Sequence, residues 1–210
     1  MRFWHKMPKQ PLPKDAKIGI SLVTYGQPDQ LASLVHALKC QTFKNYMVYI
    51  FHDGPWLLPE HERTCLAAID GDPRFKATCT GVRANNFGHN LRQTGFDLAY
   101  RDKCTWVGTM NADCWYAPVY FEWMLMEAYK ASASFVYCNM IHSHKMWGPM
   151  KTLLKRGAID AGAWLARSSL CSNTKWNSVD FAADWFFIEG LMRLPGFTPA
   201  KVDGYLFTHN

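Results

Sequence analysis

Short apolar runs alternate with segments of helical periodicity along almost the whole chain. The first such pair is an apolar run at residues 18–24 and a helix predicted over residues 28–40, where Leu31, Leu34 and Leu38 recur at helical spacing. Strands that alternate with helices favour an α/β fold. In such a fold a mainly parallel central sheet is covered by helices on both faces.

The alternation continues to the end of the chain. Further strands are predicted at residues 46–51, 75–80, 104–110, 135–141, within 159–167 and at 205–208. Further helices are predicted at residues 59–69, 90–99, 118–132 and 178–194. No repeat divides the chain, so we expect a single domain over residues 17–210. A basic, proline-containing arm at residues 1–16 precedes it.

Composition and charge exclude several classes of protein. No apolar stretch of 18 residues occurs, so no transmembrane segment is expected, and the N-terminus lacks the apolar core of a secretory signal. The formal net charge is +6 without a run of five like charges, so no nucleic-acid partner is expected. The seven cysteines are scattered without a C-x-x-C pair, which favours reduced thiols and a cytoplasmic location.

Several common catalytic motifs are absent from the sequence. The chain has no G-x-G-x-x-G after its first strand, no G-x-x-x-x-G-K-[ST], no G-x-S-x-G and no H-E-x-x-H. The sequence therefore does not support assignment to four classes of protein: dinucleotide-dependent dehydrogenases, P-loop NTPases, serine hydrolases and zincins.

Polar residues follow three of the predicted strands. Thr24 and Tyr25 end the first strand, Asp53 follows the second, and Asn111 and Asp113 follow the fourth. Ligands of open α/β sheets bind outside the carboxyl ends of the strands, so these side chains are expected to share a crevice.

Each of these residues suits a functional role and also an ordinary structural one. Asp53 suits the imide N–H of a uracil-type base, or a capped turn before Gly54. Asn111 and Asp113 point the same way if the backbone is extended, and their oxygens suit Mn²⁺ or Mg²⁺ on a diphosphate. A capped turn is again the alternative for this pair.

Charged residues near two predicted helix starts and late in the chain leave similar alternatives. Arg92 suits a phosphate at a helix N-terminus, or plain solvent exposure. Asp180 and Asp184 are expected one helical turn apart, where either suits a general base or the helix dipole. His209 suits a metal ligand or a surface position, and His142 with His144 leaves a shared metal open.

The order and spacing of these segments resemble those of a family-2 glycosyltransferase with the Rossmann-like GT-A fold, over about residues 17–195. The resemblance lies in ISLVTYGQPDQLASLVHALKCQT, YMVYIFHDGP, NNFGHNLRQTG, WVGTMNADCWYAP, AIDAGAWLARSSL and AADWFFIEGLMR. The chain departs from the family pattern where Asn111 replaces the first Asp of D-x-D and Ala183 replaces the Glu of E-D.

The resemblance implies an inverting transfer of a sugar from a UDP-sugar to a hydroxyl of a glycan or small-molecule acceptor. Asp184 would be the general base, and Asp113 and His209 would hold Mn²⁺ or Mg²⁺. The residues implied to bind the nucleotide-sugar are Thr24, Tyr25, Asp53, Arg92, Asn111 and Ala112. The segment implied on the acceptor side contains Gly162, Ala163 and Trp164.

Two other readings remain at this point. The altered D-x-D and E-D motifs are compatible with a degenerate GT-A domain that binds a nucleotide-sugar or glycan without turnover. A nucleotidyltransferase would share a related sheet, but residues 24–28 lack its usual Gly-rich loop with Arg and Lys. The sequence leaves the sugar, the acceptor and the oligomeric state open, a homodimer included.

Overall fold

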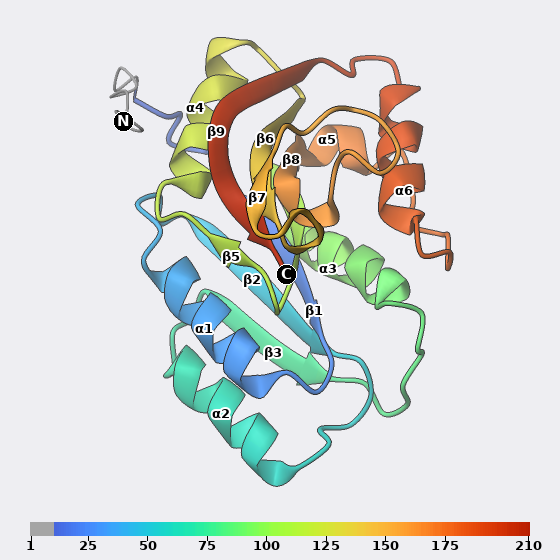
Figure 1. Cartoon of the computed structure of the whole chain (residues 1–210). Helices are drawn as coiled ribbons and strands as arrows, with labels where there is room; N and C mark the ends of the chain where they lie inside the picture. The colour runs from blue at the N-terminus through green and yellow to red at the C-terminus, as the bar shows by residue number, and fades with distance from the viewer. Residues whose placement is uncertain (1–10) are drawn as a thin grey trace.

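A nine-stranded sheet forms the centre of the molecule in the computed structural model, which describes residues 11–210 (Figure 1). Most of the N-terminal arm expected at residues 1–16 therefore lies outside the described residues. The strands are β1 (Ile18–Thr24), β2 (Tyr46–His52), β3 (Phe75–Cys79), β4 (Trp106–Asn111), β5 (Trp115–Tyr116), β6 (Phe135–His142), β7 (Gly148–Met150), β8 (Trp164–Arg167) and β9 (Pro199–His209). Their order is β3-β2-β1-β4-β8-β6-β9-β5, and β7 pairs with β6.

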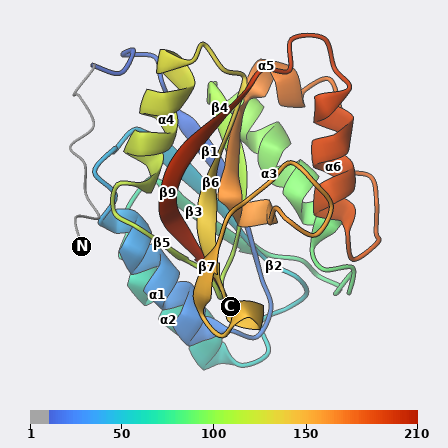
Figure 2. The same cartoon turned by 45° about the horizontal axis from the view of Figure 1, so that its top comes forward.

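Helices cover both faces of the sheet, as the sequence predicted. They are α1 (Pro28–Lys39), α2 (Pro59–Ile69), α3 (His89–Arg101), α4 (Tyr120–Lys130), α5 (Ser168–Cys171) and α6 (Ala183–Met192). Figure 2 shows α1, α2 and α4 on one side of the strands and α3, α5 and α6 on the other. Among the described residues, no helix is long and apolar enough to cross a membrane.

The first half of the sheet is parallel and the second half is mixed. Strands β3, β2, β1 and β4 pair in parallel, and every residue of β1 is buried, as expected for a strand covered on both faces. Strand β8 runs antiparallel to both of its neighbours, β4 and β6. The connection after β6 contains no crossover helix, so the chain returns antiparallel beside β6, with Trp164 of β8 opposite Tyr137.

This topology brings many chain segments to one edge of the sheet. Strand β8 is antiparallel to both β4 and β6, so β6 runs in the same direction as β1 and β4. Strand β9 pairs in parallel with β6 and shares this direction. The carboxyl ends of β1, β2, β4, β6 and β9 therefore share an edge with the segment that precedes β8. The polar residues predicted to face a crevice follow these strand ends.

Helix α3 packs unusually closely against β1 beside this edge. A Cβ on Gly95 would lie 2.2 Å from Ser21 Oγ, so only glycine permits this approach. The first turn of α3, with Arg92, is thereby held against the ends of β1 and β4.

Two element boundaries differ markedly from the prediction, at the start of α6 and the start of β9. Helix α6 begins at Ala183 rather than near residue 178, because Ser178 Oγ accepts from Asp180 N and Asp180 Oδ1 accepts from Ala182 N. Such side-chain turns compete with helix formation. Asp180 thus precedes the helix, and the expected pairing of Asp180 and Asp184 on one helical face is wrong.

Strand β9 is much longer than the predicted 205–208 strand. It contains Pro199, Asp203 and Gly204, which disfavour strand formation locally. Tertiary pairing with β6 overrides this preference, and Asn139 Nδ2 donates to Asp203 Oδ1 at 3.0 Å beside an irregularity in the ladder.

Candidate functional site

A cleft of about 870 Å³ lies at the carboxyl edge of the sheet. Its volume is within the range of about 300–1,000 Å³ that is typical of small-molecule sites. Residues predicted for nucleotide, metal and catalytic roles line it together: Thr24, Tyr25, Asp53, Arg92, Asn111, Asp113, Asp184 and His209.

Four predicted site residues do not line this cleft. Ala112 is buried and lies at a small neighbouring depression, and Gly162, Ala163 and Trp164 are buried in the core. A Cβ on Gly162 would lie 2.3 Å from the Tyr116 hydroxyl. The acceptor-side segment reaches the cleft one or two residues earlier, through Asp160 and Ala161.

Asp53 is held in place by the backbone of the loop before α3. Its Oδ1 accepts from Ala84 N at 2.9 Å and its Oδ2 accepts from Asn85 N at 3.1 Å. Asp53 N in turn donates to Thr24 O at 3.0 Å, which ties the ends of β1 and β2 together. Each carboxylate oxygen has a further lone pair, so the anchored side chain can still accept a hydrogen bond from a ligand.

An aromatic and cationic group lies beside Asp53. The Arg83 guanidinium lies 3.4 Å from the centre of the Tyr25 ring, and the His52 ring lies 5.5 Å from that of Tyr25. His52 Nε2 accepts from Gly26 N at 3.2 Å, which fixes the turn that carries Tyr25. Sequence reasoning missed Arg83 because its role depends on the loop fold, although it lies close before the NNFGHNLRQTG segment.

Arg92 is buried, with only 4% of its surface exposed, and it lines the cleft. Its Nη2 donates to Asn111 Oδ1 at 2.6 Å, while its Nε and Nη1 are buried without a partner among the described residues. Burial lowers the pKa of Arg92, and the nearby carboxylates of Asp160 and Asp184 oppose that shift. A buried guanidinium with unused N–H groups is suited to an anionic ligand.

Neutral aromatic side chains support Arg92 from α3 and the segment before α6. The guanidinium lies 5.4 Å from the Trp176 ring, and Trp176 Nε1 donates to His89 Nδ1 at 3.2 Å. Burial, together with the charge of Arg92, lowers the pKa of His89 to about 4. His89 is therefore neutral at pH 7 and adds no second cation there.

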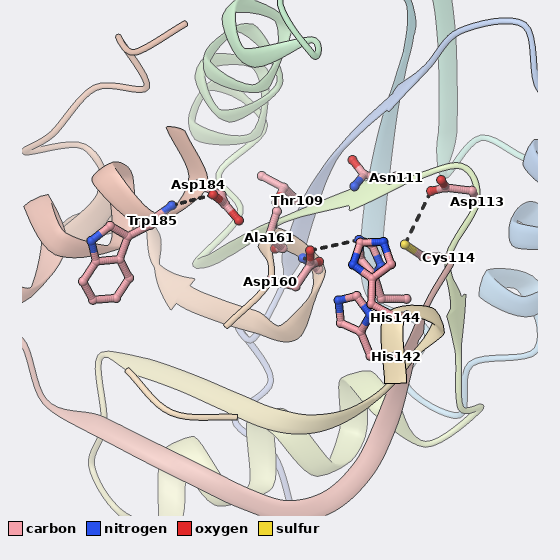
Figure 3. Close-up of polar contacts among 12 residues, drawn as sticks. Thr109, Asn111, Asp113, Cys114, His142, His144, Asp160, Ala161, Asp184 and Trp185 are labelled. Atoms are coloured by element: carbon pink, nitrogen blue, oxygen red, sulfur yellow. Dashed lines mark hydrogen bonds and ion pairs between the residues drawn. The ribbon is translucent and has the colours of Figure 1, made fainter. Parts of the chain in front are cut away.

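The chain turns immediately after Asn111, so Asn111 and Asp113 do not continue an extended strand. Cys114 N donates to Asn111 O at 3.2 Å, and Ala112 is buried between the two polar residues. The extended backbone that would point Asn111 and Asp113 the same way is therefore not present here. Both side chains still line the cleft (Figure 3).

A carboxylate that the sequence did not single out lies at the centre of this edge. Asp160 Oδ2 lies 3.2 Å from His209 Nε2, and Asp160 Oδ1 accepts from Gly162 N at 2.8 Å. Burial by itself would raise the pKa of Asp160, but His209, the Gly162 N–H and Arg92 together lower it. The hydrogen bond with Asp160 raises the pKa of His209 against the effect of burial.

Histidines gather beside this pair (Figure 3). The ring of His142 stacks on that of His209 with centres 4.5 Å apart, and His144 lies 4.9 Å from His142. Burial and the two neighbouring histidines lower the pKa of His142. Asp160 escaped the sequence analysis because only the tertiary fold brings the segment before β8 next to the end of β9.

The side chains at the cleft could supply one or two ligands to a divalent ion that takes its other ligands from a diphosphate. Within residues 11–210, no group of three or more His, Cys, Asp or Glu side chains is arranged to hold a metal. Asp113 offers a carboxylate at the cleft, and the buried His209 Nδ1 has no hydrogen-bond partner among the described residues. Mg²⁺ and similar ions often use only one or two protein ligands beside substrate phosphates and water.

Asp184 faces the cleft from the first turn of α6 (Figure 3). Burial raises its pKa to about 6, and Asp160 adds to the rise, whereas the N–H of Trp185 and the charge of Arg92 oppose it. A carboxylate that titrates near pH 6 is better matched to proton abstraction at neutral pH than an ordinary aspartate.

The family and the fold are now defined by comparison with known proteins. The profile of glycosyl transferase family 2 matches residues 20–188, and the chain belongs to this family. The fold is GT-A, with a Rossmann-like sheet, as the sequence predicted. A comparison with curated protein sequences finds no match.

Solved structures of TarS from S. aureus share the fold. TarS 1-349 in complex with UDP has a TM-score of 0.74 at 11% identity, with 92% of this chain and 60% of TarS 1-349 covered. TarS 1-349 in complex with UDP-GlcNAc has a TM-score of 0.70 at 11% identity, with coverages of 92% and 58%. This chain spans 36% of the longer TarS structure, at a TM-score of 0.72 and 10% identity.

Proposed function

We propose that this chain transfers a sugar from a UDP-sugar to an acceptor hydroxyl, with inversion at the anomeric carbon. The observation that carries the proposal is that the raised-pKa carboxyl of Asp184 shares one cleft with the predicted nucleotide-binding residues. The UDP and UDP-GlcNAc complexes of TarS, which has the same fold, support a uridine nucleotide as the donor.

The donor would occupy the part of the cleft nearest β1, β2 and α3. Asp53 would accept a hydrogen bond from the base, next to Tyr25. The unused N–H groups of Arg92 would bind the diphosphate. Thr24 would add its hydroxyl, whose oxygen is buried and has no partner among the described residues.

Asp184 would act on the acceptor. Its carboxylate takes the proton of the acceptor hydroxyl while that oxygen attacks the anomeric carbon on the face opposite the diphosphate. The bond from the anomeric carbon to the β-phosphate oxygen breaks, and UDP leaves with that electron pair. Attack from the opposite face inverts the configuration.

Asp113 and His209 would hold Mn²⁺ or Mg²⁺, with Asp160 orienting the His209 ring. When bound there, such an ion neutralises the charge that grows on the leaving diphosphate. Carboxylates that orient a metal-binding histidine through its second ring nitrogen are a common arrangement.

A panel of UDP-sugars tests the proposal by UDP release with and without Mn²⁺, followed by determination of the product's anomeric configuration. Release that depends on an acceptor, with inversion, supports it. Asn111 and Ala183, which replace acids of the family motifs, favour a second candidate, a domain that binds without turnover. UDP binding without release from any donor supports this second candidate.

A further inference from the structure

Two phenylalanine rings in the wall of the cleft are exposed rather than packed in the core. Phe87, in the loop before α3, and Phe181, in the segment before α6, both line the cleft. Phe87 is 60% exposed and Phe181 is 79% exposed, whereas Phe96 and Phe135 are fully buried. An exposed aromatic ring in a ligand cleft offers flat apolar surface that a bound ligand can cover.

A hydrogen-bonded turn before α6 holds Phe181 outward. Ala183 N donates to Asp180 O at 3.0 Å, and Ala182 N donates to Asp180 Oδ1 at 2.8 Å. Phe181 is the first of the two central residues of this turn, so its backbone is fixed while its ring projects from the chain. Asp184 follows three residues later, in the first turn of α6, and lines the same cleft. The Phe181 ring and the proposed base therefore enter the cleft from the same short segment of the chain.

Phe87 supports the Phe181 ring from another segment of the chain. The centres of the two rings lie 5.4 Å apart in an edge-to-face arrangement, with 79° between the ring planes. Phe87 has φ +57°, a left-handed conformation that bulky side chains rarely adopt and that persists where neighbouring structure holds it. Asp53 supplies that support, because its carboxylate accepts from Ala84 N and Asn85 N in the same loop. Phe87 and Phe181, here called the aromatic platform, thus join two segments that lie side by side in Figure 2.

We propose that the aromatic platform stacks against the ring of a pyranose, so that the acceptor is a glycan or a glycoside. The proposal rests on the proposed function, because it concerns the acceptor of the same reaction. A pyranose has a C–H face that packs on an aromatic ring, and hydroxyl groups around its edge that need polar partners. Phe181 supplies the ring, and the carboxylates of Asp160 and Asp184 line the same cleft, where they accept from the hydroxyls.

The carboxylates in the cleft favour a sugar over an alkyl chain as the ligand of this platform. An alkyl chain would cover the rings, but it would displace water from Asp160 and Asp184 without replacing the hydrogen bonds, at a cost in free energy. An acyclic polyol would pair with the carboxylates, but it has no rigid C–H face and loses rotational freedom on binding. A pyranose meets both requirements, and stacking on Phe181 would orient one of its hydroxyls towards Asp184.

Saturation-transfer NMR on the full chain, first saturated with UDP and Mg²⁺, tests the proposal. The pyranose probes are the methyl β-glycosides of glucose, galactose and N-acetylglucosamine, together with methyl α-mannoside. Glucitol and galactitol are the acyclic comparators. We expect at least one glycoside to bind, with saturation concentrated on the C–H protons of one ring face. Its affinity should exceed that of both alditols by roughly tenfold, because it gains the aromatic contact.

Phe181→Ala should weaken binding of that glycoside roughly tenfold and leave UDP affinity unchanged. Phe181→Tyr keeps the ring and should bind like the parent, whereas Phe181→Leu keeps apolar surface without a flat ring and should lose most of the affinity. The matched control is Phe186→Ala, since Phe186 is an exposed phenylalanine of α6 whose ring centre lies 5.4 Å from the Arg156 guanidinium. This control alters the helix that carries Asp184 without removing the platform, and it should bind like the parent.

Several results would overturn the proposal. They are no binding of any glycoside to the UDP-saturated chain, equal affinity for glycosides and alditols, parental affinity in Phe181→Leu, or equal losses in Phe181→Ala and Phe186→Ala. Hexyl β-glucoside tests the alkyl alternative, since a loss in Phe181→Ala that is confined to this probe would assign the platform to an alkyl chain and also overturn the proposal. Failure of UDP itself to bind contradicts the proposed function instead, and titration of the glycosides without UDP then tests the platform alone.

Discussion

Arg92 Nη2 donates a hydrogen bond of 2.6 Å to Asn111 Oδ1, so a buried guanidinium is bound by a neutral amide at the end of β4. A carboxylate at position 111, as in D-x-D, would neutralise that guanidinium. With asparagine the positive charge of Arg92 remains, and its Nε and Nη1 have no partner among the described residues. The departure from the family motif therefore leaves a charged anion-binding group at the cleft.

Replacing Arg92 should weaken donor binding. Hydrogen bonds to charged groups contribute about 1.5–3 kcal/mol, so Arg92→Gln should reduce UDP affinity by roughly tenfold to a hundredfold. Calorimetry with UDP measures this loss, and thermal unfolding of the unliganded variant shows whether the fold persists. An unchanged UDP affinity in a folded variant would remove Arg92 from the donor site.

Asp53 should have a double role, in ligand binding and in loop order. Asp53→Ala removes the acceptor of Ala84 N and Asn85 N and also the proposed acceptor of the base. We expect UDP affinity to fall by about 1–3 kcal/mol, and amide hydrogen exchange of residues 84 and 85 to accelerate. Faster exchange with normal UDP affinity would leave Asp53 only its structural role.

The sequence predicted the parallel half of the sheet chiefly because β1 and β2 are largely apolar runs, each followed by a helix. It failed at β9, where pairing with β6 overrides the low strand propensity of Pro199, Asp203 and Gly204. It also failed at the start of α6, where the side chains of Ser178 and Asp180 form turns that delay the helix. Hydrophobic periodicity records neither effect.

The same distinction holds for the candidate site. Residues that follow strand ends, such as Asp53 and Asp113, were predicted to share a crevice from the general geometry of α/β sheets. Asp160 lies in the segment before the antiparallel strand β8, and only the return of the chain beside β6 brings it to the cleft. Arg83 depends on the path of a loop, which carries no periodic signal.

Asp160 should tune His209 rather than bind the donor. Asp160→Asn would replace the carboxylate that lies 3.2 Å from His209 Nε2, so the raised pKa of His209 should fall. NMR titration of the His209 ring measures that change directly. If His209 is a metal ligand, Mn²⁺ affinity should also drop by about 10–100-fold. The parallel variant Asp203→Asn, on the same strand as His209, should alter neither property.

The pH dependence of transfer should report Asp184. Its pKa is raised to about 6, and a general base acts only when ionised, so transfer should rise with pH through about 6 and then level off. Asp184→Asn should lower transfer by about 10²–10⁴-fold and keep UDP affinity.

The folded state holds the Asp184 proton more tightly than the unfolded state, so this group lowers stability as pH rises from about 4 to 6. Asp184→Asn should therefore unfold at an equal or higher temperature than the parent at pH 7, which separates lost chemistry from lost structure. Asp180→Asn is the matched control, since Asp180 is exposed and precedes α6. An inactive Asp180→Asn beside a normal Asp184→Asn would assign the base to the loop instead of the helix.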